Sequence, residues 1–250
     1  MIRKLAILVP VLLLSAISAA YAASPTDTIL PGIDLGASNS PDQVTNSVKI
    51  ILLITVLSIA PAILVLMTCF TRIIVVLGFV RNALGTQQIP PNQVLIGLAL
   101  FMTFFIMGPT FSQMNQQALQ PFMKGKMTQQ EAFHKASIPL KEFMSKQTRE
   151  KDLELFLDYG KMKMPKKVED IPLRALVPAY AISELKSAFQ MGFMIFIPFL
   201  VIDMIVSSVL MSMGMMMLPP VMISLPFKIL LFILVDGWHL IVKSLLISFQ

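Results

Sequence analysis

Asp203 and Lys228 are the ionisable side chains with the clearest potential for chemistry, because each interrupts an apolar stretch of this 250-residue sequence. They flank residues 211–220, and their midpoint falls between Met215 and Met216. If the two stretches are helices joined at this segment, each charge lies about 18–19 Å from the bend. Because lone charges in apolar helices usually pair, we predict an intramembrane Asp203–Lys228 salt bridge that sets the register of a helical hairpin.

Two other interpretations of these charges stay open. Each charge could face a different water-filled surface. Alternatively, Asp203 or Asp236 could carry protons in an ion-coupled membrane transporter that uses Asp203 and Lys228, since broken helices with intramembrane charges are typical of transporters. A transporter should also show internal symmetry between its halves, and the sequence shows no repeat.

The segment between the two charges reads MSMGMMMLPP and holds five methionines in its first seven positions. Gly214 weakens a helix, and Pro219 with Pro220 stops one, so we predict a bend between two apolar helices. Methionine is flexible and polarizable, and it suits surfaces that repack around varied contacts. The segment is either a methionine-rich turn in the core of a membrane protein or a deformable apolar seal in a pore.

Other reactive side chains are sparse. Cys69 is the only cysteine, so it forms no internal disulfide, and its apolar surroundings predict a buried, inert thiol. Neither His134 nor His239 belongs to a cluster with metal-ligand spacing, so we expect no metal and no cofactor. The sequence also lacks a nucleophile–base set, paired carboxylates and a phosphate-binding glycine loop, and we predict that it is not an enzyme.

The composition predicts a membrane protein. Hydrophobic residues make up 56% of the chain and charged residues 14%, against about 25% charged in soluble domains. Residues 113–183 hold 12 of the 20 Lys and Arg residues and 8 of the 14 Asp and Glu residues, and we interpret them as a water-facing domain. The mixed charges of this block argue against nucleic-acid binding.

The N-terminus has the features of a secretory signal peptide. Arg3 and Lys4 precede an apolar run, and small residues ending in Ala-Tyr-Ala follow. We predict a signal peptide over residues 1–22, with cleavage between Ala22 and Ala23; the alternative is an uncleaved anchor. Residues 23–47 are rich in Pro, Gly, Asp, Asn and Ser, and are expected to form a flexible exported tail.

Four apolar segments follow, and most of them contain proline. They are 50–70, with Pro61 predicting a kink or break; 94–111; 189–218, interrupted by Pro198; and 221–249, cut by Pro226, Lys228, Asp236 and Lys243. No uninterrupted apolar run in the last segment reaches the ~18 residues expected of a spanning helix. We therefore expect protein to cover most of its surface.

These segments predict an all-α, multi-pass membrane-associated protein of kinked helical hairpins. Residues 48–112 form the first apolar hairpin, 113–183 a charged helical periplasmic domain, and 184–250 a second apolar hairpin with its bend at 211–220. An exported N-terminus places the charged domain and the C-terminus on the exported side, and Arg72 and Arg81 in the first inside loop. This arrangement conflicts with the positive-inside rule, which is weak for loops longer than ~60 residues.

The charged domain is predicted to be helical. Thr128 and Glu131 have the spacing of a capping box, and Gly160 is a predicted C-cap. An apolar stripe at helical spacing consists of Leu153, Phe156 and Leu157. Four prolines are expected to divide the domain into short helices: Pro139, Pro165, Pro172 and Pro178.

Two long strings resemble the FliP/SctR family of type III export-gate subunits. They are MTCFTRIIVVLGFVRNALGTQQIPPNQVLIGLALFMTFFIMGP at 67–109 and IPFLVIDMIVSSVLMSMGMMMLPPVMISLPFKILLFILVDGWHL at 197–240. The order of signal peptide, apolar segments and charged block is also similar. The injectisome relatives usually lack the long exported N-terminal part, which favours the flagellar branch.

The resemblance implies a subunit of the flagellar type III export gate in the bacterial inner membrane and flagellar basal body, with part of the assembly on the periplasmic side. In this family several copies assemble with FliQ and FliR, and they work with FlhA and FlhB. Unfolded flagellar proteins pass through the centre of the complex. A scaffold without a pore is the remaining alternative.

The resemblance also assigns roles to residues of the methionine-rich segment. It implies a pore gasket around the closed channel, formed by Met213, Met215, Met216 and Met217. The hinge of the gating loop would be Gly214, Pro219 and Pro220. Much of the apolar surface would then pack on neighbouring subunits rather than on lipid.

Overall fold

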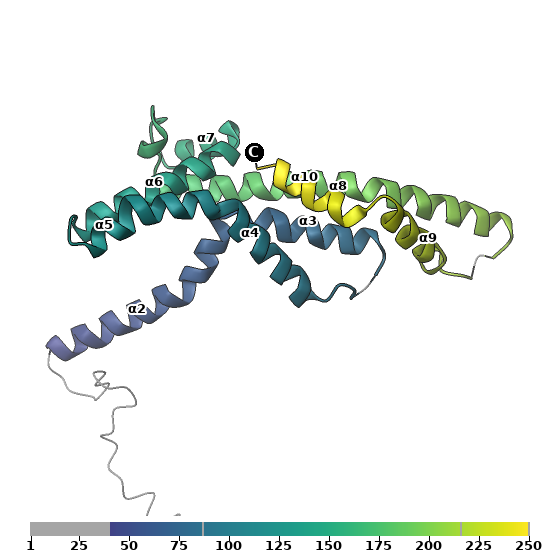
Figure 1. Ribbon diagram of the computed structural model, residues 1–250, viewed down its shortest axis with the longest axis horizontal. Helices are drawn as coiled ribbons and strands as arrows, with labels where there is room; N and C mark the ends of the chain where they lie inside the picture. Colours follow the sequence, from purple (N-terminus) through teal and green to yellow (C-terminus); the bar gives the residue numbers. More distant parts are fainter. Residues whose placement is uncertain (1–40, 87, 216, 250) are drawn as a thin grey trace, which may run out of the picture. The chain divides into compact units, whose positions relative to one another are not determined.

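All the secondary structure described by the computed structural model, which covers residues 41–86, 88–215 and 217–249, is helical (Figure 1). The all-α prediction is confirmed. The predicted signal peptide, its cleavage site at Ala22 and Ala23, and Met216 lie outside the described residues.

The chain divides into two compact units, one up to Ala60 and one formed by Pro61–Gln250. Helix α2 (Pro41–Leu66) runs across this division and stays helical through Pro61. The hydroxyls of Thr55 and Ser58 donate to backbone carbonyls one turn earlier, at 2.8 Å each. These bonds satisfy the only two hydroxyls of an otherwise apolar stretch from residue 50 to residue 66 within the helix itself.

Helix α3 (Phe70–Ala83) contributes a fully buried apolar face to the core of the second unit. Its side chains Ile73, Val76, Leu77 and Val80 recur at helical spacing and are fully buried. This apolar face packs on α8 (Leu173–Ser212), and α3 also contacts α4 (Asn92–Met114).

A glycine on α8 lets the two central helices approach closely. A Cβ atom added at Gly192 would lie 2.4 Å from a ring atom of Phe79 on α3, which is closer than any real Cβ contact. The aromatic ring therefore occupies the space that a larger residue at position 192 would need.

The charged block consists of several helical elements: η1 (Asn115–Leu119), α5 (Gln120–Met123), α6 (Gln129–Gln147), α7 (Glu150–Tyr159) and η2 (Val168–Asp170). The predicted capping box is present: the Thr128 hydroxyl accepts from Glu131 N at 3.3 Å, and the Glu131 carboxylate accepts from Thr128 N at 2.9 Å. The donated hydrogen bonds lower the pKa of Glu131.

Other predictions for the charged block have mixed outcomes. Leu153 and Leu157 are buried on one face of α7, and the helix ends at Gly160 as expected. Two of the four prolines do not divide helices, because Pro139 lies inside α6 and Pro178 inside α8. Pro139 is buried, and the packing of α6 outweighs the ~3 kcal/mol that an internal proline costs a helix.

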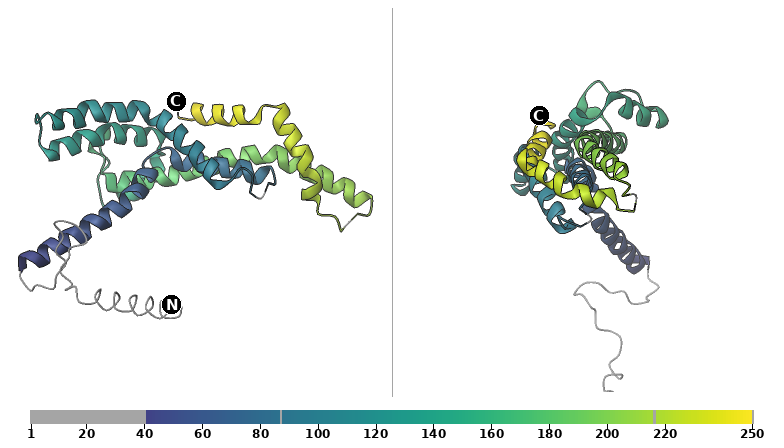
Figure 2. Two further views of the ribbon diagram at one scale, coloured as in Figure 1. Left: turned by 60° about the horizontal axis from the view of Figure 1, so that its bottom comes forward. Right: turned by 90° about the vertical axis from the view of Figure 1, so that its right-hand side faces the viewer.

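Helix α8 runs through position 183 without interruption, although the sequence suggested an element boundary there. Its 40 residues correspond to ~60 Å. The helix packs on α3, α6 and α7, and also on α9 (Pro220–Leu234). Figure 2 shows α8 and α9 as a hairpin closed by the methionine-rich bend.

The number of apolar helices differs from the four predicted segments. Among the described residues, two helices are long and apolar enough to cross a membrane: Asn92–Met123 and Leu173–Ser212. A third results if α9 and α10 (Gly237–Ile247) count as one bent span. The segment 50–70 is not a single helix, because α2 ends at Leu66 and α3 begins at Phe70.

The last apolar segment bends by 63° between α9 and α10. Asp236 lies at the break with φ of 50°, in the left-handed region. A Cβ atom at Gly237 would lie 2.3 Å from the ring of Phe232, so the ring packs directly on the glycine backbone. The segment that sequence reasoning considered a poor spanning helix is therefore broken within its length.

Candidate functional site

The methionine-rich bend begins with a glycine-dependent end to α8. Gly214 has φ of 76°, a conformation that is costly for residues with a Cβ atom. Met215 N donates to Leu210 O at 3.0 Å, and Gly214 N donates to Met211 O at 3.1 Å. This pair of bonds is a Schellman motif, and it satisfies carbonyls that would otherwise lack donors.

The bend ends at the two prolines. Pro219 is the N-cap of α9 and Pro220 is its first residue. A proline fits this position because the first helical N–H has no partner within the helix, and its fixed φ suits the helix start. The residue types at both ends of the connection thus determine where α8 ends and where α9 begins.

The methionine side chains of the bend extend away from the rest of the chain. Met217 is 99% exposed, Met213 62% and Met215 43%. Three thioether side chains in one short connection form an apolar surface that the chain itself leaves uncovered. Such surfaces usually mark contact with another molecule.

The structure brings Asp203 and Lys228 together across the hairpin. Lys228 Nζ lies 2.6 Å from Asp203 Oδ2, and Ser224 Oγ donates to Asp203 Oδ1 at 2.5 Å. The lysine side chain is only 3% exposed, and the aspartate side chain is 26% exposed. Because the pair joins α8 to α9, sliding one helix along the other would strand a buried charge.

A glycine from a third helix approaches the same lysine. Gly85 follows the last residues of α3 and has φ of 76°. A Cβ atom there would lie 3.8 Å from Lys228 Nζ and 3.7 Å from a methyl group of Val221. The backbone at Gly85 therefore lies close to the ammonium group, and a side chain at this position would enter the space beside Lys228. Sequence reasoning missed Gly85, although glycine in a loop rich in Gln and Pro is a signal for a special backbone conformation.

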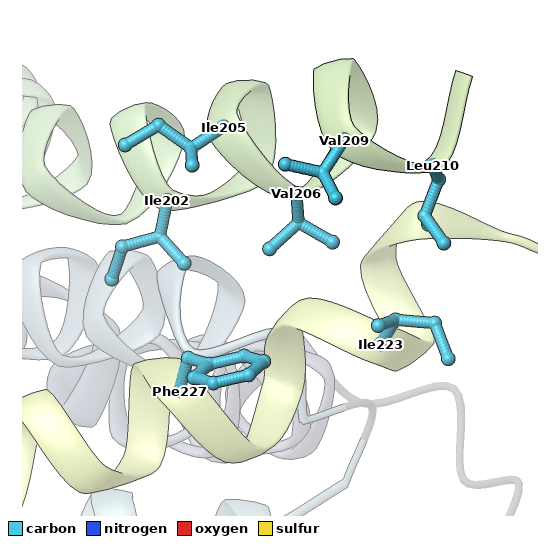
Figure 3. Close-up of a pocket in the computed structure, with 7 residues that line it drawn as sticks. All are labelled: Ile202, Ile205, Val206, Val209, Leu210, Ile223 and Phe227. Atoms are coloured by element: carbon cyan, nitrogen blue, oxygen red, sulfur yellow. The ribbon is translucent and has the colours of Figure 1, made fainter. Parts of the chain in front are cut away.

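An apolar groove of about 470 Å³ lies between the two helices near the bend (Figure 3). Its lining side chains contain only carbon and come from both helices: Ile202, Ile205, Val206, Val209, Leu210, Ile223 and Phe227. With no polar side chain in its lining, the groove has no means to bind an ion or to carry a proton.

A second ion pair, which sequence reasoning missed, lies in the core. Arg72 and Glu184 are both buried and in contact, with Arg72 Nε donating to Glu184 Oε2 at 3.0 Å. Arg72 also donates to Ser248 O at 2.9 Å and to Gln147 Oε1 at 3.0 Å. Its guanidinium carbon lies 4.0 Å from the centre of the Phe249 ring. Arg72 thus joins α3, α6, α8 and the residues after α10.

Arg72 is buried, although the sequence predicted that it lies in a loop. It was expected in the first inside loop, separated from the charged domain by the apolar segment 94–111. Its hydrogen bond to Gln147 places it against α6 of that domain instead. In a sequence, a charged residue beside a polar residue usually indicates a loop. Here Glu184 neutralises the charge of Arg72, so the arginine can be buried.

The residue before Glu184 anchors another helix. Ser183 Oγ donates to Asp152 Oδ2 at 2.6 Å and accepts from Arg149 N at 3.0 Å. The Arg149 side chain also donates a hydrogen bond to Ser183 O on α8, at 3.1 Å. Two consecutive residues of α8 therefore hold the N-terminal ends of α3 and α7.

The described residues contain no group of three or more His, Cys, Asp and Glu side chains that could hold a metal. Cys69 is buried, as its apolar surroundings predicted. Asp236 is exposed at the break between α9 and α10. In the part of the chain that the structure describes, Asp203 is the carboxylate that pairs with Lys228, and it is bonded at both oxygens.

Comparison with known proteins shows the relatives of this sequence. Residues 53–245 match the FliP family. The flagellar biosynthetic protein FliP of Bacillus subtilis (strain 168) is 68% identical over 217 residues, covering 87% of this chain and 98% of that protein. The FliP of Aquifex aeolicus (strain VF5) is 46% identical over 223 residues, covering 88% and 92% of the two chains. With this extent of similarity across its apolar helices and its charged domain, the chain belongs to the FliP family.

Proposed function

We propose that this chain is a subunit of the flagellar type III protein export gate. Its relatives are named for flagellar biosynthesis, which supports a role in building that organelle. The observation that carries the proposal is the exposed methionine bend at the end of a hairpin that an ion pair registers. A bend with exposed apolar side chains and a fixed position suits the wall of a passage for unfolded protein.

The passage requires several chains, because the bend of one chain cannot enclose a channel. In the proposed assembly, copies of this chain combine with FliQ and FliR in the inner membrane, with part of the complex on the periplasmic side. FlhA and FlhB are further partners. Large apolar side chains along α8 and α9 are exposed in the single chain, which supports coverage by neighbouring subunits.

The mechanism is steric sealing by Met213, Met215, Met216 and Met217. Their side chains from several copies meet and close the channel to ions and small solutes. When an extended chain enters, the same side chains move aside and repack around its varied residues. An unbranched thioether suits both states, because it has more rotatable bonds and fewer restrictions than a β-branched side chain.

Gly214 and the prolines at 219 and 220 act as the ends of the moving loop in this proposal. The helices before and after them stay in place because Asp203 and Lys228 are held together below the bend. The ion pair keeps the methionines of each copy at one height, so that they form a ring. This role needs no titration of Asp203, unlike the role in an ion-coupled transporter.

Deletion of residues 215–217 tests the proposal in membrane vesicles that contain the whole export complex. A gasket predicts an increased leak of ions through the closed gate. A scaffold predicts no change in leak, and a transporter predicts loss of solute uptake without a leak. An unchanged leak in an assembled deletion complex contradicts the gasket.

Cysteine crosslinking tests whether the bends meet. Met215→Cys and Met217→Cys are each expected to give crosslinks between copies, in a background where the native Cys69 is buried and silent. Tyr159→Cys on the charged domain, at a position almost as exposed as Met217, serves as the control and should not crosslink. Absence of a crosslink from both bend positions in the assembled complex contradicts a ring of methionines.

A further inference from the structure

The methionines of the described residues range from fully buried to almost fully exposed. Met217 is 99% exposed and Met213 62%, whereas Met107 and Met144 are fully buried. Gly214 and the prolines hold the bend away from both helices, so the exposure of its thioethers follows from the backbone. Clustered, accessible thioether sulfur is a substrate for two-electron oxidants.

The reaction of such a sulfur with hydrogen peroxide is balanced without any other group. The thioether sulfur attacks one peroxide oxygen, the O–O bond breaks, and the products are methionine sulfoxide and water. Two thiols reverse the change by taking up the oxygen as water and forming a disulfide, which is the reaction that methionine sulfoxide reductases catalyse. The oxidation replaces an apolar side chain with a polar, chiral one.

We propose that the methionine bend is an oxidant-sensitive site, at which sulfoxide formation opens the closed gate to ions. The inference rests on the proposed gasket function. A constriction lined by thioethers excludes water and ions because its surface is apolar. Sulfoxide oxygens accept hydrogen bonds from water, so oxidised side chains hydrate the constriction and it no longer seals.

Four of the other exposed methionines provide a matched comparison. Met123, Met194, Met204 and Met222 are 63–77% exposed in the single chain and lie outside the bend. Oxidation at these positions adds polar groups to helix surfaces but not to the constriction. The proposal therefore assigns the effect of oxidant to the bend, where Met213, Met215 and Met217 are the exposed methionines that carry the argument, rather than to exposed methionine in general.

The test uses membrane vesicles that contain the complete export complex, with hydrogen peroxide as the probe. Mass spectrometry measures a gain of about 16 Da for each sulfoxide in the peptide that carries the bend, with Met107 and Met144 as internal controls. Ion leak is measured before and after peroxide, and each variant is compared with its own untreated sample. In the natural sequence we expect bend oxidation and a several-fold rise in leak. Both should be reversed by the two methionine sulfoxide reductases together with a thiol, since each enzyme reduces one sulfoxide epimer.

Two leucine variants separate the bend from the rest of the chain. Replacing Met213, Met215, Met216 and Met217 with Leu should abolish the rise in leak. Replacing Met123, Met194, Met204 and Met222 with Leu should leave the rise intact. If the bend variant does not assemble, the variant at Met123, Met194, Met204 and Met222 still decides the question, because it keeps the bend methionines and must keep the rise in leak.

The outcomes distinguish this inference from the gasket itself. If the bend is oxidised without a change in leak, while deletion of 215–217 does cause a leak, the oxidant-sensitive site is overturned and the gasket stands. If neither treatment changes the leak, the gasket is overturned as well. A bend that stays unoxidised in the complex, or a rise in leak that the control variant removes, also contradicts the proposal.

Discussion

Arg72 and Glu184 form a buried ion pair although 112 residues separate them in the sequence. The pair is the centre of a network that reaches Gln147 and Ser248. Replacing Arg72 with Met leaves the Glu184 carboxylate buried without its partner, at a cost of roughly 3–5 kcal/mol. We expect a fall in Tm of roughly 6–20 °C in detergent-solubilised protein.

The double replacement Arg72→Met with Glu184→Met should be more stable than either single variant, because no unpaired charge remains. Glu142→Gln, at an exposed position on α6, is the control and should leave Tm unchanged. Equal destabilisation by the single and double variants would show that the pair contributes through packing alone.

The environment of the Asp203–Lys228 pair predicts that its two single variants lose different amounts of stability. Asp203→Ala strands a lysine that is 3% exposed, whereas Lys228→Ala leaves an aspartate that is 26% exposed and still bonded to Ser224. Asp203→Ala should therefore cost more, up to about 3–5 kcal/mol, and the double variant should recover part of the loss. Thermal unfolding measures the stability of each variant, and ion leak of the same complexes measures how well the closed gate seals. A double variant no better than Asp203→Ala contradicts a role for the pairing.

Replacing Gly192 with a larger residue is expected to cause a local packing defect. Gly192→Ala places a Cβ atom 2.4 Å from the ring of Phe79, and overpacking of this kind costs about 1–3 kcal/mol. The destabilisation should be reduced when Phe79→Leu is combined with it. Gly97→Ala is a control on another helix, since a Cβ atom there meets nothing within 4 Å. Unfolding midpoints of the three variants test the prediction, and equal behaviour of the two glycines refutes it.

Replacing Gly214 is expected to strain the backbone without causing a steric clash. Its φ is 76° and a Cβ atom there meets nothing within 4 Å, so Gly214→Ala should cost about 1–2 kcal/mol through backbone strain. Gly125, with φ of 67° and equally open surroundings, gives the matched control Gly125→Ala. Both variants should lose similar stability, but only Gly214→Ala should change ion leak. A leak of the same size from both variants removes the special role of the bend.

The capping box predicts a pH-dependent helix start. Because the hydrogen bonds from Thr128 lower the pKa of Glu131 in the folded protein, the ionised carboxylate stabilises the start of α6. This stabilisation is present above the ordinary value of 4.5 and is lost as the pH falls through the lower folded value. Amide exchange at residues 128–131, corrected for intrinsic rates, should show it. Glu131→Gln should lack the pH dependence, and its persistence in that variant would assign the effect to another group.

Local signals in the sequence predicted much of the hairpin and of the charged domain. Gly214 and the two prolines have conformational preferences that end helices in almost any surroundings, so the bend could be placed. Thr128 and Glu131 interact within a single turn, which makes the capping box visible in the sequence. The contact between Asp203 and Lys228 could be anticipated because one bend at a known position fixes which residues lie opposite each other.

The core network could not be predicted in the same way. No spacing rule relates Arg72 to Glu184, since their contact depends on how three separate helices pack. The continuity of α8 through Pro178 was also hidden, because tertiary packing decides whether a helix tolerates proline. The break between α2 and α3 lies in a run without any charge, and hydropathy alone does not reveal where such a run changes direction.

Helix α8 carries both ion pairs on one continuous element. Glu184 and Asp203 are 19 residues apart, or ~28 Å along the helix axis. Because α8 is one continuous helix, it connects the charged domain to the methionine bend. Pro198 lies between the two pairs, and its missing N–H leaves the carbonyl of Met194 without a helical donor. Between the two ion pairs, Pro198 is therefore the position where bending of α8 is expected.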